Sequence, residues 1–317
     1  MLNENKTIDR RQFLGAAGLL TASIWLSPKW LYAQEQSPVI KIKKAAATAK
    51  INVTKLRGNI SVLEGSGGNI AVLNGPQGKL MVDGGIGVSK VNVSAALKSI
   101  SSQPLKYLIN THWHFDHADG NEWLHEAGAT IISHENTRKH LAVSTRVDDW
   151  NYTFPAAPKG ALPTVTFKDE HTMSFNGETL QMKHYAPAHT DSDISVYFPN
   201  ADILHVADTW WNGYYPFIDY NTGGNIEGAI KAANLNVSRT TDKTIIIPGH
   251  GPIGNRKQLI EFRDMLVDIH AKVSTLKKQG KSVNEVVALK PTAAYDKKWG
   301  GFVIDPAFFT KLVYRGA

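Results

Sequence analysis

Short apolar runs alternate with turn-forming residues along the chain from about residue 51 onward. In the first half, runs separated by turns rich in Gly and Asn predict a meander of strands, and longer stretches with helical spacing then alternate with buried-type strands. The expected strands are Ile51–Leu56, Ile60–Leu63, Asn69–Leu73, Lys79–Val82, Leu105–Ile109 and Thr130–Ser133. The expected helices are Val88–Ile100, Asn121–Ala127 and Glu135–Val143.

A second set of strands followed by helices begins after residue 164. The expected strands are Val165–Phe167, Thr172–Phe175, Thr179–His184, Ile194–Phe198, Ile203–Val206 and Thr244–Ile247. The expected helices are Ile226–Asn236 and Arg256–Lys278. Both halves therefore place strands before helices, which predicts an α/β protein.

Two segments depart from this alternation. Residues 144–163 are rich in proline and aromatic residues, a composition that predicts either a lid over a substrate or an ordered surface loop that packs its own aromatic side chains. Residues 34–50 place lysines among alanines and are expected to form a polar arm. One domain is then expected to span residues 51–317.

Residues 1–33 have the pattern of a targeting segment. The pair Arg10-Arg11 is followed by an apolar stretch from Phe13 to Leu26 and by the small residue Ala33. This stretch is shorter than the ~20 apolar residues that span a bilayer. It resembles a bacterial twin-arginine signal peptide, which implies contact with the twin-arginine translocase, export to the periplasm, cleavage and no stable membrane insertion afterwards.

The composition excludes several classes of function. The chain has no cysteine, which rules out disulfides, thiolate nucleophiles, iron–sulfur clusters and Cys-containing zinc sites. The 35 Lys+Arg exceed the 28 Asp+Glu to give a formal net charge of +7. Because these basic residues form no dense block, nucleic acid is not an expected partner. Any metal must therefore be held by histidine and carboxylate side chains.

Potential metal ligands of these two kinds gather where apolar strands begin or end. Four of them lie on one loop after the strand Leu105–Ile109, where they can converge on a small volume, and three more flank strands of the second half. The candidate ligands are His112, His114, Asp116, His117, His189, Asp208 and His250. Seven such ligands suit two zinc ions, each with a coordination position left for water.

The order of these ligands follows a recognisable pattern. His-x-His-x-Asp-His, then a later His, a later Asp and a C-terminal Pro-Gly-His-Gly-Pro resemble the metallo-β-lactamase superfamily of hydrolases. The resemblance implies a four-layer αβ/βα sandwich with two metal ions at one edge of its two sheets. It also implies a first metal on His112, His114 and His189, and a second on Asp116, His117 and His250.

By the same resemblance, Asp208 bridges the two ions, and Asp116 acts as a catalytic proton carrier as well as a ligand. Zinc is the favoured metal, since redox diiron relatives usually have Glu where this chain has His114. A pair of zinc ions lowers the pKa of water toward ~7. The implied activity is hydrolysis of a small-molecule substrate by a metal-bound hydroxide.

The substrate is not given by the fold, because the superfamily cleaves β-lactams, lactones, thioesters, phosphodiesters and sulfate esters. Asp208 stands where β-lactamases generally have Cys or Ser, and Trp211 stands where many have a Lys that binds the β-lactam carboxylate. We therefore expect a small carbonyl ester, lactone or amide. The alternatives are β-lactam hydrolysis as the main function and a non-catalytic periplasmic metal-binding protein.

A few further residues have two interpretations each. Asp83 either orients a ligand imidazole or starts a turn. Asn225 either polarises a substrate carbonyl or caps a helix. The aromatic residues that follow Asp208 either line the mouth of the site or pack in the core, and they are Trp210, Trp211, Tyr214, Tyr215 and Phe217.

Overall fold

The computed structural model describes residues 37–317, so the predicted signal peptide lies outside the described residues. The strands are β1 (Asn52–Lys55), β2 (Ile60–Glu64), β3 (Ile70–Gly75), β4 (Gly78–Val82), β5 (Leu105–Asn110), β6 (Thr130–His134), β7 (Thr145–Val147), β8 (Tyr152–Phe154), β9 (Val165–Phe167), β10 (Glu170–Phe175), β11 (Glu178–His184), β12 (Ile194–Phe198), β13 (Ile203–Trp211) and β14 (Ile245–His250). The α-helices are α3 (Pro38–Ala46), α4 (Lys90–Ile100), α5 (Phe115–Ala118), α6 (Asn121–Glu126), α7 (Glu135–Leu141), α8 (Ile226–Ser238), α9 (Arg256–Lys278), α10 (Val283–Ala288), α11 (Asp296–Trp299) and α12 (Pro306–Gly316).

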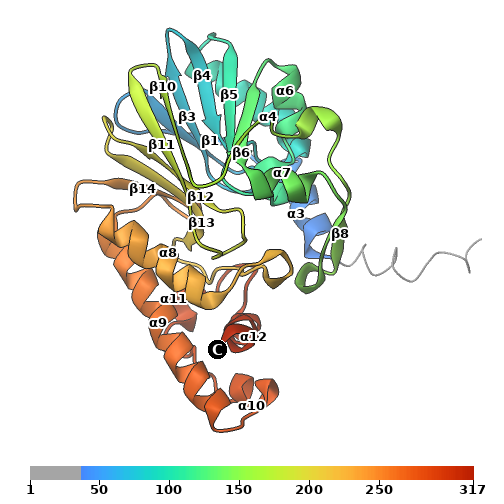
Figure 1. Cartoon of the computed structure of the whole chain (residues 1–317), viewed down its shortest axis with the longest axis vertical. Helices are drawn as coiled ribbons and strands as arrows, with labels where there is room; N and C mark the ends of the chain where they lie inside the picture. Colours follow the sequence, from blue (N-terminus) through green and yellow to red (C-terminus); the bar gives the residue numbers. More distant parts are fainter. Residues whose placement is uncertain (1–36) are drawn as a thin grey trace, which may run out of the picture.

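Two mixed sheets form the centre of the molecule (Figure 1). The first has the order β1-β2-β3-β4-β5-β6-β9, with the predicted antiparallel meander β1 to β4 continued by parallel strands. The second has the order β10-β11-β12-β13-β14, and its last pair is parallel. Strand β9, expected with the second set, instead pairs in parallel with β6 and extends the first sheet.

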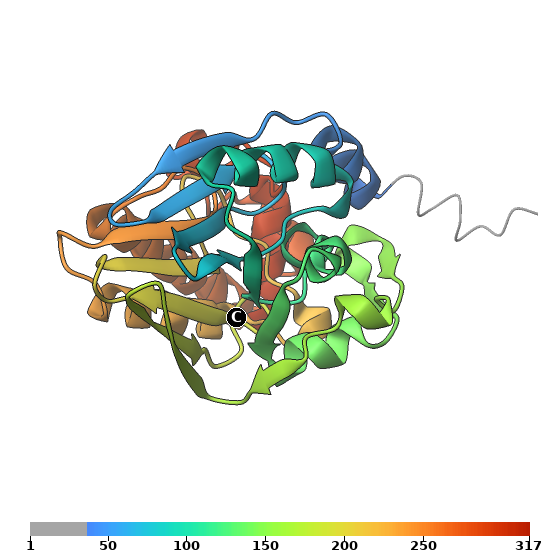
Figure 2. The same ribbon diagram turned by 90° about the horizontal axis from the view of Figure 1, so that it is seen from above.

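Three clusters of buried side chains separate four layers. The central cluster joins the facing sides of the sheets, for example Leu80 of β4 and Phe198 of β12, both 0% exposed. A second cluster lies between the first sheet and the helices α4 and α6, and a third lies between the second sheet and the helices α8 and α9. Viewed from above, α4 runs along the outer side of the first sheet (Figure 2). The predicted four-layer α/β sandwich is therefore confirmed.

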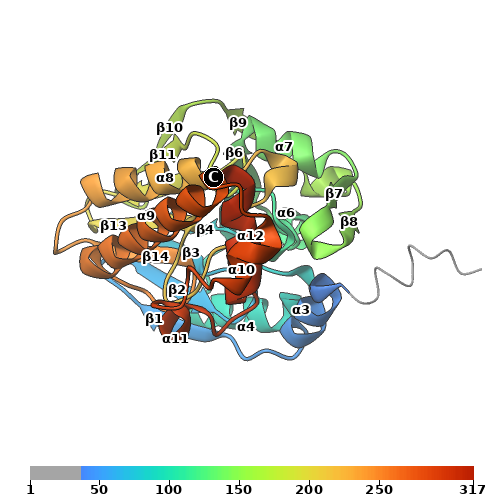
Figure 3. The ribbon, with the colours of Figure 1, turned by 90° about the horizontal axis from the view of Figure 1, so that it is seen from below.

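The C-terminal residues belong to the third cluster. Phe309 and Leu312 of α12 are fully buried there, and α12 contacts both α8 and α9 (Figure 3). Among residues 37–317, no helix combines the length and the apolar character needed to cross a bilayer. After His250, helix α9 thus packs on β13 of the second sheet, and α10 and α12 pack on α9.

The segment expected to be a polar arm contains a helix instead, α3. Pro38 at its start and the following alanines favour a helix, and the Ser37 Oγ caps it by accepting a hydrogen bond from the Val39 N–H at 3.2 Å. Val39 is fully buried, so α3 docks on the domain through one apolar face. The lysines that indicated an arm lie on its remaining surface.

Residues 144–163 form an ordered structure rather than an open loop. Strands β7 and β8 pair as a hairpin, and the aromatic side chains Trp150, Tyr152 and Phe154 are each less than 10% exposed. The hairpin lies beside α3 (Figures 1 and 3), and the Ser37 Oγ donates a hydrogen bond to the Trp150 carbonyl at 2.6 Å. The aromatic side chains of this segment are therefore packed, and two of them, Trp150 and Phe154, also line the cavity beside the candidate ligands. Whether the segment acts as a lid stays a prediction.

Candidate metal centre

The ends of β5, β13 and β14 meet at one edge of the two sheets. Strand β5 delivers His112 and His114, and the short helix α5 that follows turns Asp116 and His117 back toward the same point. Strand β14 ends at His250. Rigid strands thus fix the starting point of each loop that carries a candidate ligand.

An irregular stretch of β13 places the Asp208 side chain among the candidate ligands at this edge. The pairing of β13 with β14 shifts register on both sides of Ala207, and Ala207 itself has φ of 45°. This left-handed conformation is costly for a residue other than glycine and is typical of functional positions. Gly249 lies against Asp208 so closely that any Cβ there would collide with its carboxylate.

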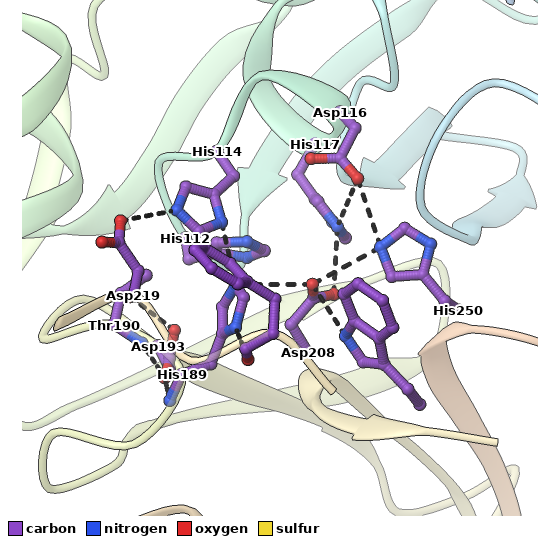
Figure 4. Close-up of polar contacts among 12 residues, drawn as sticks. His112, His114, Asp116, His117, His189, Thr190, Asp193, Asp208, Asp219 and His250 are labelled. Carbon is purple, nitrogen blue, oxygen red and sulfur yellow. Dashed lines mark hydrogen bonds and ion pairs between the residues drawn. The ribbon is translucent and has the colours of Figure 1, made fainter. Parts of the chain in front are cut away.

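The seven predicted ligands lie together in this place (Figure 4). They form three overlapping groups in which the ligand atoms all lie within 4.8 Å of one another. The groups are His112–His114–His189, His112–His117–Asp208 and Asp116–His117–His250. Buried His and Asp clusters of this kind are consistent with a dinuclear metal site.

Asp208 lies between the two sets of histidines. Its Oδ1 is 3.0 Å from the His117 Nε2, and its Oδ2 is 3.4 Å from both the His189 Nε2 and the His250 Nε2. One carboxylate thus faces ligand atoms of both predicted metals. This is the position that a bridging ligand requires.

Several buried polar atoms of the cluster have no hydrogen-bond partner in the described part of the chain. They are the Nε2 atoms of His112, His117 and His250 and the Oδ1 of Asp208. Three of these atoms face an opposite charge instead, since the His117 Nε2 lies 3.0 Å from the Asp208 Oδ1 and the His250 Nε2 lies 3.2 Å from the Asp116 Oδ2. A cation bound among them would satisfy all four atoms at once. Divalent cations fit this donor set, because imidazole nitrogen and carboxylate oxygen are their common ligands.

The opposite nitrogen of most of these imidazoles is held by a protein oxygen. Such bonds fix the ring orientation and leave the other nitrogen free for a metal. They join His112 Nδ1 to Thr111 Oγ1 at 3.0 Å, His114 Nε2 to Asp219 Oδ2 at 3.0 Å, His117 Nδ1 to Asp83 Oδ2 at 2.7 Å and His189 Nδ1 to the Phe217 carbonyl at 2.8 Å. The Nδ1 of His114 and the Nε2 atoms of His112, His117 and His189 therefore face the centre of the cluster, where the His114 Nδ1 and the His189 Nε2 lie 2.8 Å apart.

The cluster combines ionised carboxylates with imidazoles, which suits the binding of cations. Burial lowers the pKa of His189 to about 4, so this imidazole is neutral and ready to coordinate. Burial opposes ionisation of Asp208, but the nearby His117, His250 and His189 hold the pKa of its carboxyl well below the ordinary value. His250 is desolvated as well, yet Asp208 and Asp116 raise its pKa to about 9. Protons on the imidazoles here balance the carboxylates, a role that bound cations would take over.

Asp83 orients a ligand, as one of its two interpretations predicted. It has φ of 67°, and besides His117 its carboxylate accepts hydrogen bonds from the Thr111 N–H and Oγ1, both at 2.8 Å. Asp219 does the same for His114 but was missed in the sequence. Asp219 follows no predicted strand, so its position in the sequence gave no reason to place it at the site. Its carboxylate also accepts a hydrogen bond from the Thr222 Oγ1 at 2.7 Å, within a local turn.

The remaining candidates separate into distinct roles. Asn225 caps α8, since its Oδ1 accepts from the Gly228 N–H at 2.7 Å. Trp210 and Tyr215 are fully buried in the core. Trp211 lines the site and donates its indole N–H to the Asp208 Oδ2 at 3.0 Å. The last contact has no signal in the sequence, because it depends on the irregular path of β13.

A cavity of about 380 Å³ opens onto the cluster. Asp116, Asp208, His114, His189 and His250 reach it from the metal site, and the rest of its wall is apolar. Sites for small molecules typically have volumes of ~300–1,000 Å³ and apolar walls with a few polar groups. The cavity therefore has the size and lining of a small-molecule site.

Replacing Asp83 with asparagine is expected to weaken metal binding by ~10–100-fold, the usual effect of losing a group that orients a ligand. The amide can donate to the His117 Nδ1, which moves the imidazole proton to Nε2 and blocks the metal-facing nitrogen. Isothermal titration of the metal-free protein with zinc would measure the change. A D83N variant with wild-type zinc affinity would show that the Asp83–His117 contact at 2.7 Å does not set the tautomer.

Comparisons with known proteins agree with this geometry. The family model described as the metallo-beta-lactamase superfamily matches residues 63–254. A curated relative, the linear primary-alkylsulfatase of Pseudomonas sp. (strain ATCC 19151), is 24% identical over 248 residues, which cover 66% of this chain and 47% of the relative. This chain thus spans about half the length of that relative.

Solved structures share the fold. The stereoselective inverting sec-alkylsulfatase Pisa1 from Pseudomonas sp. matches with a TM-score of 0.63 and 15% identity, over 86% of this chain and 51% of that one. A metallo-beta-lactamase from Pontibacter korlensis matches with a TM-score of 0.56 and 19% identity, over 69% of this chain and 100% of that one. With a family model that covers more than half of the sequence and a site that gathers all seven candidate ligands, the chain belongs to the metallo-beta-lactamase superfamily of metal-dependent hydrolases.

Proposed function

We propose that this protein is a dinuclear zinc hydrolase that cleaves a small carbonyl ester, lactone or amide. The observation that carries the proposal is the convergence of seven candidate ligands beside a cavity that five of them line, with no hydrogen bond made by four of their buried polar atoms. His112, His114 and His189 are proposed to hold one ion, and Asp116, His117 and His250 the other. Asp208 is proposed to contact both.

Two cations at such a site lower the pKa of a water molecule and offset negative charge that develops on a carbonyl oxygen. The residues of the chain then orient the reactants and move protons. Asp116 is suited to carry the proton, because its side chain is 16% exposed and faces the cavity, with its Oδ2 3.2 Å from the His250 Nε2. Burial opposes its charge, but His117 and His250 lower its pKa to about 2, so the side chain is ionised and its suitability as a proton carrier rests on its position at the cavity.

The lining of the cavity supports an uncharged substrate. Within residues 37–317, the cavity wall includes no Lys or Arg that would bind a substrate carboxylate. Trp211 stands in the wall and contacts Asp208, so it leaves no place there for a carboxylate-binding lysine. A dedicated β-lactamase is therefore a less favoured alternative, as is a protein that only binds metal.

A second candidate is hydrolysis of alkyl sulfate esters. It is favoured by the two alkylsulfatases among the similar proteins and by the apolar wall of the cavity. The lack of a cationic side chain in that wall counts against it, since a sulfate group is a permanent anion. Comparing the turnover of a carboxylic ester with that of an alkyl sulfate decides between the two candidates.

Removal of the metal is expected to abolish activity and to destabilise the fold. We expect the purified protein to contain about two zinc ions per chain and to hydrolyse a lactone or carboxylic ester until a chelator is added. A ligand at ~1,000 times its Kd stabilises a fold by ~4 kcal/mol, and in a domain of this size each kcal/mol changes Tm by ~2–4 °C. The metal-free protein should therefore melt roughly 10 °C lower.

The panel for this experiment includes a carboxylic ester, an amide, a lactone, a thioester, a phosphodiester, an alkyl sulfate and a chromogenic β-lactam. Turnover of carbonyl substrates that zinc restores after chelation supports the proposal. Turnover confined to alkyl sulfate would replace it with the second candidate. Two zinc ions without any turnover would favour the non-catalytic alternative.

We also propose that the protein is exported to the periplasm. The support is the arginine pair at residues 10–11 with the apolar stretch that follows it. Export by the twin-arginine translocase would carry the folded domain with its metal site already formed. Changing both arginines to lysine and locating the protein by cell fractionation tests this, with retention in the cytoplasm as the expected result.

A further inference from the structure

Two segments outside the part of the chain matched by the family model complete the cavity wall. One is α3 with the residues just after it, and the other is the turn at residues 302–303. Residues 63–254 supply the metal ligands, whereas these two segments supply apolar side chains. They are Ile42, Ala45, Ala46, Ala49, Phe302 and Val303.

None of the three lysines of α3 lines this cavity, and Lys43 is held by other contacts. Lys43 forms an ion pair with Asp119 at 3.1 Å and its Nζ lies 5.6 Å from the centre of the Phe115 ring. It lines a different, neighbouring cavity. The helix therefore presents its apolar face to the metal site and keeps its positive charge elsewhere.

Helix α3 is attached at both ends and forms a fixed wall. At its start, the Ser37 Oγ binds the Trp150 carbonyl at 2.6 Å, and at its end the Ser89 Oγ donates to the Ala46 carbonyl at 3.0 Å. Such anchoring lowers the entropic cost of ordering the wall around a ligand.

The other segment leaves large apolar side chains uncovered beside the site. Phe302 is 44% exposed and Val303 is 37% exposed. The centre of the Phe302 ring lies 4.7 Å from that of Tyr214 and 6.2 Å from that of His250. Exposed apolar side chains at the rim of a cavity are typical of ligand-binding surfaces. An apolar group in the cavity would bury them.

From this wall we propose that the substrate carries an uncharged apolar chain, alkyl or aryl, which lies against Ile42 of α3 and Phe302 while its reacting carbonyl faces the metal ligands. This inference rests on the proposed function. Substrate preference is then set by the two segments outside the superfamily core. The proposal is carried by the cavity, which the candidate ligands share with the apolar side chains of Phe302 and Ile42.

The test is a series of 4-nitrophenyl esters from acetate through butyrate and hexanoate to octanoate. Each CH₂ buried in an apolar site contributes ~0.8 kcal/mol, so kcat/KM should rise by up to about fourfold per methylene until the cavity is filled. Ile42→Ala and Phe302→Ala are each expected to lower kcat/KM for octanoate by about tenfold and for acetate much less. Val91→Ala is the matched control, since Val91 is an apolar residue of α4 that is 78% exposed and outside the cavity wall.

A second measurement does not require turnover. Titration of each variant with an uncharged naphthylamine fluorophore reports whether the apolar wall binds an apolar ligand, with weaker binding expected in both wall variants and not in V91A. Both wall residues are partly exposed, so their truncation should leave the fold intact. Weaker probe binding without any ester turnover would support the apolar site while rejecting the proposed reaction. Ester turnover that does not depend on chain length, with unchanged probe binding in I42A and F302A, would overturn the inference and keep the reaction.

Discussion

Asp208→Ala is expected to remove both metal binding and hydrolysis. Loss of a group that only orients a metal ligand usually lowers metal affinity or activity by ~10–100-fold. Asp208 contacts both halves of the site, so its loss should lower metal affinity and kcat/KM by more than about 100-fold. Asp208 is 4% exposed and lies within 3.4 Å of His117, His189 and His250. Without its negative charge, two cations bound at the two halves of the site would repel each other more strongly.

Metal content by elemental analysis and kcat/KM for the best ester would be measured on the same preparation. Asp242→Ala is the matched control, because the Asp242 side chain is 94% exposed and lies outside the site. We expect the control to retain two zinc ions and full activity. If D208A held two zinc ions, the assignment of Asp208 as the bridging ligand would be wrong.

Much of the fold is visible in the sequence because its central strands, such as β4, β12 and β13, are mostly apolar and almost entirely buried. The β9, β12 and α9 boundaries coincide with those expected from apolar periodicity and helix signals. The sequence did not show which sheet β9 joins, since a three-residue strand has too few side chains to specify a partner. Pairing with β6 is decided by the connection through α7 and the β7–β8 hairpin.

The predicted polar arm shows where composition misleads. Lysines at residues 41, 43 and 44 indicated a solvated segment. In the structure, Val39 and Ala46 are buried on one side of α3 and the lysines lie on the others. A helix of two or three turns contains too few apolar residues for their helical spacing to be recognised in the sequence.

All seven candidate ligands were identified from their places beside strands, and the structure brings every one of them into the site. The groups that orient them were found only in part. Asp83 has a signal, because it ends a strand before two glycines, but Asp219 and Trp211 do not. Their contacts depend on the path of loops between distant segments, which periodicity does not describe.

Asp116→Asn is expected to lower kcat by ~10²–10⁴-fold, the usual contribution of a positioned proton carrier, while the first metal is retained. The change keeps the shape of the side chain but removes the charge that lies 3.2 Å from the His250 Nε2 and 3.7 Å from the His117 Nε2. The ligands His112, His114 and His189 are unaffected, so metal content should fall from about two ions to no fewer than one.

The leaving group separates proton transfer from metal binding. An alkyl ester expels a poor leaving group that needs a proton, whereas a 4-nitrophenyl ester expels a stable anion that does not. If Asp116 passes the proton on, D116N should slow hydrolysis of the alkyl ester much more than hydrolysis of the nitrophenyl ester. Both esters are tested on one preparation, so the metal content is the same. Asp264→Asn, at a carboxylate that is 61% exposed on α9, should slow neither. Equal losses on both esters in D116N would mean that Asp116 acts as a metal ligand alone, and the proton would then have to leave through another group facing the cavity.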